Sequence, residues 1–464
     1  MLKDLAIKTV WWLWRGSPPL PIPNREVKPL SADDTWLTPG KVCRRQPYYN
    51  QSLTIVRLFF CAYLAIFDPM YSKPIALLIF SLISFHLCSA QSMRGISVLN
   101  DSQVWVSGNK GYIGRLNADT LEACPVPVEY RNKDFRDIHA FSSSHAIAMS
   151  VADSGVLLKT RDFGRTWLEV FRDNDSSVFF DVIEFNNGGN LGLLMGDPLP
   201  TKPNYLYFRV SLDSGDHWIE LTDGKWNRIS PKLDALFAAS GSSVRLLDFD
   251  YNKKKGIIAL KLIMGGGGVK GASLRLAYVN WNTYGELLNE KITDIPLPLP
   301  SEKGWGVYGL SEAINNQIVL AGGHWQYPNG RNTVSDSGEN KLSICDDGLY
   351  LLKFSDAAMS LKPLKLCNYI SGTAFLNANE IVSVGSSGIS KLNLPRKRSD
   401  GKASLSWNPN QLGITEYVTN SINALSTPFK GLNSVSVSEN YVWMTGSAPK
   451  HLLLRIPKTV YTSN

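Results

Sequence analysis

A nine-residue segment occurs twice in this 464-residue sequence, at positions 159–167 and 210–218. Each copy contains Ser or Thr, Asp, Gly and Trp at the same spacing, in the pattern (S/T)-x-D-x-G-x-(T/H)-W, and equivalent positions lie 51 residues apart. Self-similarity at such a period is typical of repeat architectures. Because one repeat of this length buries its apolar side chains only against its neighbours, we expect the chain to fold as an array of similar units.

The residue types of this segment suit a tight hairpin turn. The Asp can accept backbone N–H groups across the turn, and the Gly two residues later can take the positive φ that the turn requires. The Trp can then pack on the flank of the hairpin. The pattern is the Asp-box, and it predicts structural roles, not catalytic ones, for Asp162, Gly164, Trp167, Asp213, Gly215 and Trp218.

A weaker element recurs along the chain as a short apolar strand that ends in small residues. It is found at 104–108, 146–150, 193–196, 262–266, 319–323, 381–385 and 442–446. We expect a shorter strand before each of these, as at 95–98 and 236–240, and another strand after it. The array runs from 93 to 458, so seven units have a mean period of about 52 residues.

Short, evenly spaced strands with Gly between them predict an all-β fold, a seven-bladed β-propeller. One four-stranded blade cannot bury both of its faces, whereas blades packed in a closed ring can. The Asp-box is degenerate in the other units, for example at 282–285, so six or eight blades remain alternatives. A solenoid is less favoured, because no leucine-rich or hexapeptide pattern is present.

Composition and charge exclude several classes of protein. Hydrophobic residues make up 44% of the chain and charged residues 19%, which excludes intrinsic disorder and a polytopic membrane protein. The net charge is +8, but residues 1–90 hold 10 basic and 5 acidic side chains, which leaves 38 and 35 in the remainder. A nucleic-acid-binding domain should carry a clustered basic face. We therefore expect no nucleic-acid partner.

The N-terminal ninety residues contain a segment with the three parts of a secretory signal. A short basic start at 70–73 is followed by an apolar run at 74–85 and by small residues before Gln91. We expect a signal peptide at 70–90, a propeller at 91–464, and an over-extended, mis-assigned start at 1–69. The alternatives are an authentic extension with a membrane anchor, and a lipoprotein signal at Cys88. All three place the propeller outside the cytoplasm, secreted or periplasmic, with membrane contact only through the N-terminal hydrophobic segment.

Cysteine and histidine usage gives no sign of a metal or a disulfide framework. Outside the N-terminal segment the Cys residues are Cys124, Cys345 and Cys367. Cys345 and Cys367 could pair, but free buried thiols explain them equally well. His residues are scattered, and neither CxxC nor HExxH occurs, so we expect no metal site and no cofactor.

The paired Asp-boxes occur together with MRGIS at 93–97, WVSG at 105–108, FFD at 179–181 and MGDP at 195–198. With these motifs the chain resembles the exported BNR/Asp-box propellers of Bacteroidetes-type bacteria, which are related to the photosystem II assembly and stability-factor propellers. The resemblance covers about 91–464. It implies a non-catalytic role in envelope protein assembly or surface recognition, although members are often labelled oxidoreductase or glycosyl hydrolase. The chain departs from the family by losing most of its Asp-boxes.

In a propeller, the loops between the second and third strands and between blades gather at one mouth of the channel. A polar rim with aromatic side chains there suits a protein or glycan partner, and we expect the protein to be a monomer. Ordinary solvated loops are the alternative, and a turn beside Pro198 is the simpler role for Asp197. The candidate binding residues are Arg94, Arg136, Asp153, Asp181, Asp197, Tyr308, His324 and Trp325.

Two enzymatic alternatives are weaker. A sialidase-like glycoside hydrolase needs three arginines on the substrate carboxylate, a Tyr/Glu nucleophilic pair and an acidic Asp; Arg94 and Arg136 could serve, but no third arginine with such a pair is evident. LRIP at 454–457 is similar to the sialidase motif FRIP but lies in the last repeat. An oxidoreductase would need a nucleotide site, and the four-glycine run at 265–268 is not GxGxxG within a βαβ unit.

Overall fold

The protein is described by a computed structural model that covers residues 92–152, 154–324, 331–334, 340–344, 348–354, 359–364, 369–385, 388–394, 415–418, 431–447 and 452–458. In these ranges the regular structure consists of β-strands and one short 3-10 helix, η2 (Val128–Tyr130). The prediction of an all-β chain is confirmed.

The N-terminal half of the ring contains three antiparallel sheets in chain order. The first two have four strands each, and the third has three. Their strands are β1 (Met93–Asn100), β2 (Gln103–Gly108), β3 (Ile113–Asn117) and β4 (Thr120–Cys124); β5 (Phe135–Ala140), β6 (Ala146–Ser150), β7 (Val156–Thr160) and β8 (Leu168–Arg172); and β9 (Phe180–Phe185), β10 (Gly192–Gly196) and β11 (Tyr207–Ser211).

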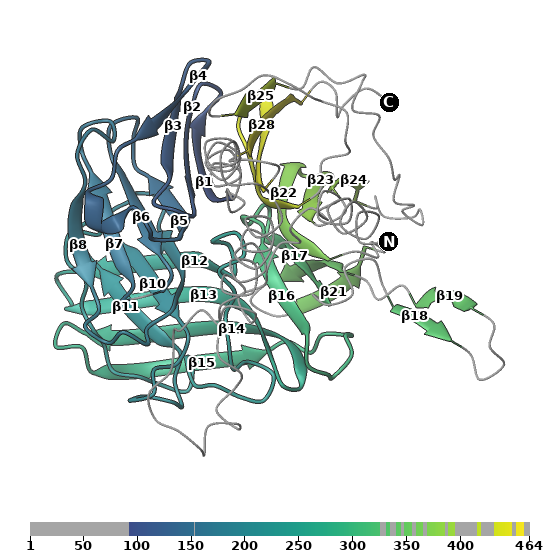
Figure 1. Ribbon diagram of the computed structural model, residues 1–464. Coiled ribbons are helices and arrows are strands. Elements are labelled where there is room, and N and C mark those ends of the chain that lie inside the picture. The colour runs from purple at the N-terminus through teal and green to yellow at the C-terminus, as the bar shows by residue number, and fades with distance from the viewer. Residues whose placement is uncertain are drawn as a thin grey trace, which may run out of the picture.

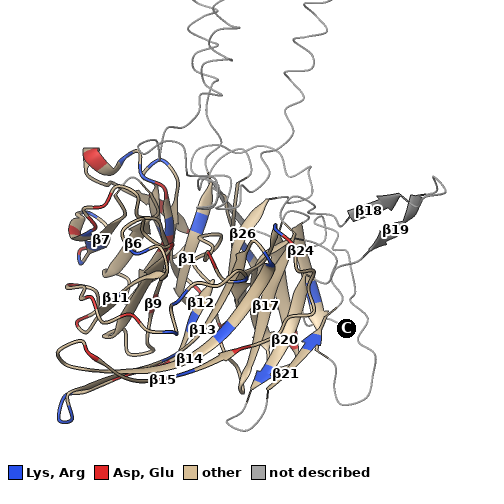
Figure 2. Ribbon diagram, turned by 90° about the horizontal axis from the view of Figure 1, so that it is seen from below, with Lys and Arg blue, Asp and Glu red and all other residues tan. Residues whose placement is uncertain are grey.

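The next two groups of four strands are joined into one sheet, because Gly267 of the first group pairs with Gly306 of the second. Strands of the first group are up to twelve residues long, and its β14 and β15 extend away from the ring in Figure 2. The strands are β12 (Val244–Asn252), β13 (Ile257–Gly268), β14 (Gly271–Asn282), β15 (Leu287–Asp294), β16 (Trp305–Leu310), β17 (Gln317–His324), β20 (Leu349–Phe354) and β21 (Met359–Pro363).

The C-terminal sheets depart from a simple repeat. Strand β25 precedes β26 in sequence, yet it is the outermost strand of the last sheet, where it pairs with β28. Strands β18 and β19 pair only with each other among the described strands. The strands are β18 (Arg331–Val334), β19 (Asn340–Ile344), β22 (Ile370–Asn377), β23 (Glu380–Gly385), β24 (Gly388–Asn393), β25 (Thr415–Val418), β26 (Leu432–Val437), β27 (Tyr441–Gly446) and β28 (Leu452–Pro457).

The innermost strands contact one another in a ring. Going round it, β1 contacts β5, and the contacts continue through β9, β12, β16, β22 and β26 back to β1. Figure 1 shows the sheets following one another around a common centre. The closure is hydrogen-bonded, since Asn433 Nδ2 donates to the Met93 carbonyl at 2.6 Å and Thr445 Oγ1 donates to the Arg94 carbonyl at 3.4 Å. A closed ring of antiparallel sheets is a β-propeller.

The second strand of a sheet is buried on both faces, because neighbouring sheets cover it on each side. All five residues of β6 and of β10 are buried, and their sequences are the short apolar runs AIAMS and GLLMG. Such continuous runs are what a strand buried on both faces requires, in place of polar–apolar alternation.

Residues 236–240, which the sequence predicts as a strand, form none. They belong to a segment that runs along the axis of the ring, and the inner strand of this unit, β12, begins only at Val244. Phe237 packs on Tyr308 of β16, with ring centroids 4.4 Å apart. Gly241 lies so close to Asp137 of β5 that a Cβ atom at Gly241 would be only 2.2 Å from Asp137 Oδ1. The prediction was wrong because these apolar residues are buried inside the ring without pairing as a strand.

Candidate functional site

Six of the inner strands share an irregularity close to their first residue. The antiparallel ladder skips one residue there, which forms a β-bulge. Bulges turn a side chain away from the direction that the regular pleat would give it. The ladder of β12 also skips a residue, Leu247, which is the fourth residue of its strand, as Tyr308 is of β16. The skipped residues of the other strands are Arg94, Arg136, Asp181, Tyr308, Ser371 and Asn433.

Four of the predicted binding residues are therefore at equivalent positions, at the end of the ring where the inner strands begin. We expected these blade-entry residues to line the mouth of the channel or its inner wall, and the structure shows all four buried: Arg94, Arg136, Asp181 and Tyr308. They lie inside the ring because the bulges turn them inward and because residues 236–242 fill the axis beside them.

Arg136 is held by its own neighbours. Its Nε donates to Asp134 Oδ2 at 2.8 Å, and its guanidinium lies 5.9 Å from the centre of the Phe179 ring. The ion pair with Asp134 compensates the charge of Arg136 where little water reaches it.

Arg94 lies in a different environment. Burial lowers the pKa of its guanidinium to about 10; the charge of Arg136 adds to this effect, whereas Asp134 and Tyr369 oppose it. Arg136 is on β5, next to β1, but Tyr369 precedes β22, which β26 separates from β1 in the ring. A side chain of β1 that interacts with both groups points toward the axis.

Aromatic rings pack beside these arginines. Tyr308 contacts Phe237 at 4.4 Å and Tyr369 at 4.9 Å between ring centroids, and its Oη donates to the Gly304 carbonyl at 3.1 Å. Burial raises the pKa of Tyr369 to about 12, although Arg94 and Arg136 oppose the shift. Its phenol therefore stays protonated at neutral pH. We call Arg94, Arg136, Phe237, Tyr308 and Tyr369 the axial site.

The remaining predicted residues do not join the axial site. His324 ends β17, where its ring packs on Trp305 at 5.5 Å and its Nε2 is 3.2 Å from the Lys303 carbonyl. The backbone N–H of Asp197 donates to the Phe179 carbonyl at 3.0 Å, on the rim between β10 and β11. Asp153 and Trp325 lie outside the described residues, as do Cys345 and Cys367.

The two Asp-boxes are turns at the opposite end of the ring. Asp162 Oδ1 accepts the Thr166 N–H at 2.9 Å, and Asp213 Oδ1 accepts the His217 N–H at 2.9 Å. The glycines have φ of +80° at Gly164 and +85° at Gly215. Both carboxylates therefore accept hydrogen bonds within their own turns.

Each Asp-box packs against the preceding sheet. Trp167 makes an edge contact with Trp105 of β2 at 6.0 Å, and a Cβ on Gly164 would lie 2.5 Å from the Cys124 Sγ at the end of β4. Burial raises the pKa of the Cys124 thiol to about 12, so it is an inert part of this contact. The boxes therefore seal the joints between blades.

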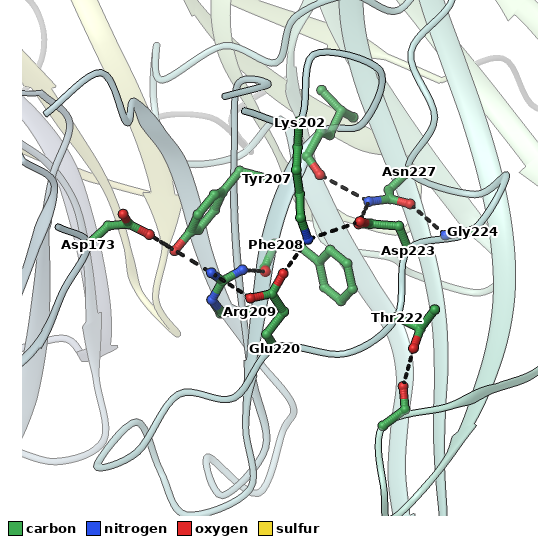
Figure 3. Close-up of polar contacts among 12 residues, drawn as sticks. Asp173, Lys202, Tyr207, Phe208, Arg209, Glu220, Thr222, Asp223, Gly224 and Asn227 are labelled. Carbon is green, nitrogen blue, oxygen red and sulfur yellow. Dashed lines mark hydrogen bonds and ion pairs between the residues drawn. The ribbon is translucent and has the colours of Figure 1, made fainter. Parts of the chain in front are cut away.

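A polar cluster that the sequence analysis missed lies at the outer edge of the third sheet, where Ile219 forms a single bridge to Val210 of β11 in place of a full fourth strand (Figure 3). Tyr207 Oη donates to Asp173 at 2.7 Å, and Arg209 pairs with Glu220 at 3.1 Å. Lys202 pairs with Glu220 as well. Each of these charged groups has a protein partner, so the cluster holds the loop after β10 onto the edge of β11.

A second, partly buried charged cluster lies further along the inner strands. Arg245 of β12 donates to Glu184 of β9 at 2.9 Å and to the Leu310 carbonyl at 3.0 Å. Burial raises the pKa of Glu184 to about 7, and Glu312 adds to this shift. Arg245 is thus committed elsewhere and does not supply a third arginine beside Arg94 and Arg136, as a sialidase-like site would need.

In the described ranges, no three His, Cys, Asp or Glu side chains are placed to hold a metal ion. None of the helices in this part of the chain is long and apolar enough to cross a membrane. The axial site offers cations, phenols and aromatic rings, a set of groups suited to binding an anionic or aromatic ligand.

No protein-family model matches the sequence, and no curated protein matches it. Solved structures match at low identity. YCF48 bound to D1 peptide is 10% identical with a TM-score of 0.45, over 80% of this chain and 95% of that chain. The RRP9 WD40 repeats are 10% identical with a TM-score of 0.44, over 79% and 94%. An extracellular domain from B. thetaiotaomicron is 10% identical with a TM-score of 0.42, over 79% and 38%. These values assign no family.

Proposed function

We propose that this chain is an exported, seven-bladed propeller that binds a protein partner at the end of the ring where the inner strands begin. The observation that carries the proposal is the set of bulges that turns one residue of most inner strands toward the axis at that same end. The bulge recurs because the fold requires this backbone geometry, whereas the side chain at the bulge differs from strand to strand. Side chains that the fold does not fix are available for binding a partner.

The blade number rests on the ring of inner strands β1, β5, β9, β12, β16, β22 and β26, each the first strand of one unit. Export rests on the signal-like segment at 70–90, with the propeller at 91–464. Binding without chemistry rests on the axial site itself: Arg136 is paired with Asp134 and Tyr369 stays protonated, so the site lacks an activated nucleophile with its base.

The rim around the axial site is basic on the side of the first two sheets. Lys110 and Arg131 are both exposed there, and the backbone of Gly111 lies against that of Arg131, so the two side chains share one part of the rim. Exposed cations around a site attract anionic groups and increase their rate of association. The rim therefore favours a partner that presents acidic groups.

The experiment is affinity capture from an extract of the source cell envelope with the full chain as bait. Lys110→Glu/Arg131→Glu changes the rim, and the control Lys253→Glu/Lys254→Glu makes the same charge change at exposed hairpin residues of the opposite end. We expect the rim variant to lose the partner and the control to retain it. Equal recovery by both variants, or a captured species that glycosidase and not protease removes, would contradict the proposal.

A further inference from the structure

Arg94 differs from the other buried arginines in how its charge is compensated. Arg136 has Asp134 at 2.8 Å, and Arg275 has Asp294 at 2.6 Å. The guanidinium of Arg94 forms no hydrogen bond or ion pair with any described residue, although only 8% of the residue is exposed. A mostly buried guanidinium without an ion-pair partner loses much of its hydration and gains no compensating contact.

The charges around Arg94 define the ligand that would compensate it. Arg136 has its ion-pair partner in Asp134, whereas Arg94 has no such partner among the described residues. A single carboxylate supplies one partner for one guanidinium. The planar guanidinium fork matches the two oxygens of a carboxylate, which can accept two parallel N–H groups.

The surroundings of Arg94 define what the anion is attached to. Tyr369 interacts electrostatically with Arg94, and its ring packs on Tyr308, which packs on Phe237. Together with Ala239 these aromatic side chains form one buried apolar cluster. An apolar or aromatic group beside the carboxylate would pack on this wall.

We propose that Arg94 binds the carboxylate of an apolar ligand at the axis of the ring. This inference rests on the proposed function, because it names the chemical group that the axial site recognises. The carboxylate could come from the C-terminus of a peptide or from a free small acid, and both sources present the same group to Arg94.

The test uses the full chain and the shift of its unfolding midpoint with added benzoate, at constant ionic strength. Benzamide, which has the same ring and no charge, is the matched probe. We expect a saturable increase with benzoate and none with benzamide. Arg94→Met should weaken benzoate binding roughly tenfold to hundredfold, as expected for the loss of a charge-assisted pair. Arg161→Met, at a half-exposed arginine, should bind as the wild type does.

Two further probes separate the sources. A tetrapeptide, Gly-Ser-Gly-Phe, with a free C-terminus is compared with its C-terminal amide. Tighter binding of the free peptide than of benzoate identifies a peptide terminus, and binding of benzoate alone identifies a small acid; both support the inference. An equal benzoate response in the wild type and Arg94→Met, or tighter binding of inorganic phosphate than of benzoate, would overturn it. Loss of carboxylate binding with intact partner capture would leave the proposed function standing.

Discussion

The Asp-box corners and the axial site are built in opposite ways from the same repeat. At the corners the side chains recur: Asp162 and Asp213 each accept the backbone N–H of the residue four positions on. At the axis the backbone recurs and the side chains do not, since equivalent bulges carry arginine in β1, aspartate in β9 and tyrosine in β16. The side chains that recur at the corners stabilise the contacts between blades. The side chains at the bulges differ between strands, so they are available for binding.

The same contrast appears in the energetics. Corner side chains are matched to their neighbours, as Trp167 is to Trp105 across the joint between the first two sheets. Arg94 is buried without an ion-pair partner among the described residues. Substitutions at the two places should therefore change the free energy of unfolding in opposite directions, and this difference can be measured without knowing the ligand.

The largest effect is expected at the corner. Trp167→Ala removes a buried indole that packs on Trp105, and should lower the free energy of unfolding by about 3–5 kcal/mol. The measurement is chemical denaturation of the full chain. Phe163→Ala, an exposed neighbour in the same Asp-box, is the control and should cost at most about 1 kcal/mol. Similar losses for both variants would mean that the corner does not seal the joint.

A smaller, pH-dependent effect is expected from the charged cluster inside the ring. The pKa of Glu184 is about 7 in the folded protein and 4.5 as its ordinary value, so the folded state binds this proton more tightly. The resulting stabilisation is complete below pH 4.5 and is lost as the pH rises through 7, by up to about 3 kcal/mol.

Glu184→Gln keeps an acceptor for Arg245 and removes this titration. Denaturation at pH 5 and pH 8 should show a smaller loss of stability in the variant than in the wild type. Glu122→Gln, at an exposed carboxylate paired with Arg115, is the control and should follow the wild type. Parallel pH profiles for the wild type and Glu184→Gln would contradict the assignment.

The sequence predicted the features that depend on local patterns. Apolar runs such as 146–150 and 193–196 are strands in the structure, because burial on both faces requires continuous apolar residues. Arg94, Arg136, Asp181 and Tyr308 were chosen as the residues that enter each blade, and the structure places all four at bulges.

The features that depend on contacts between distant segments could not be predicted. Residues 236–240 have the composition of a strand, and only the ring shows that they fill its axis. Tyr369 and Phe237 were not predicted as site residues, because neither lies in a repeated motif and both reach the axial site from different units.

The most direct test is the free energy of unfolding of Arg94→Met in the absence of any ligand. Methionine fills a similar volume without a charge, so the variant should be more stable than the wild type by about 1–2 kcal/mol. Arg245→Met, which leaves Glu184 without its partner, should be less stable over the same denaturation series. A loss of stability in Arg94→Met of the size seen in Arg245→Met would show that Arg94 is a structural residue and would contradict the account.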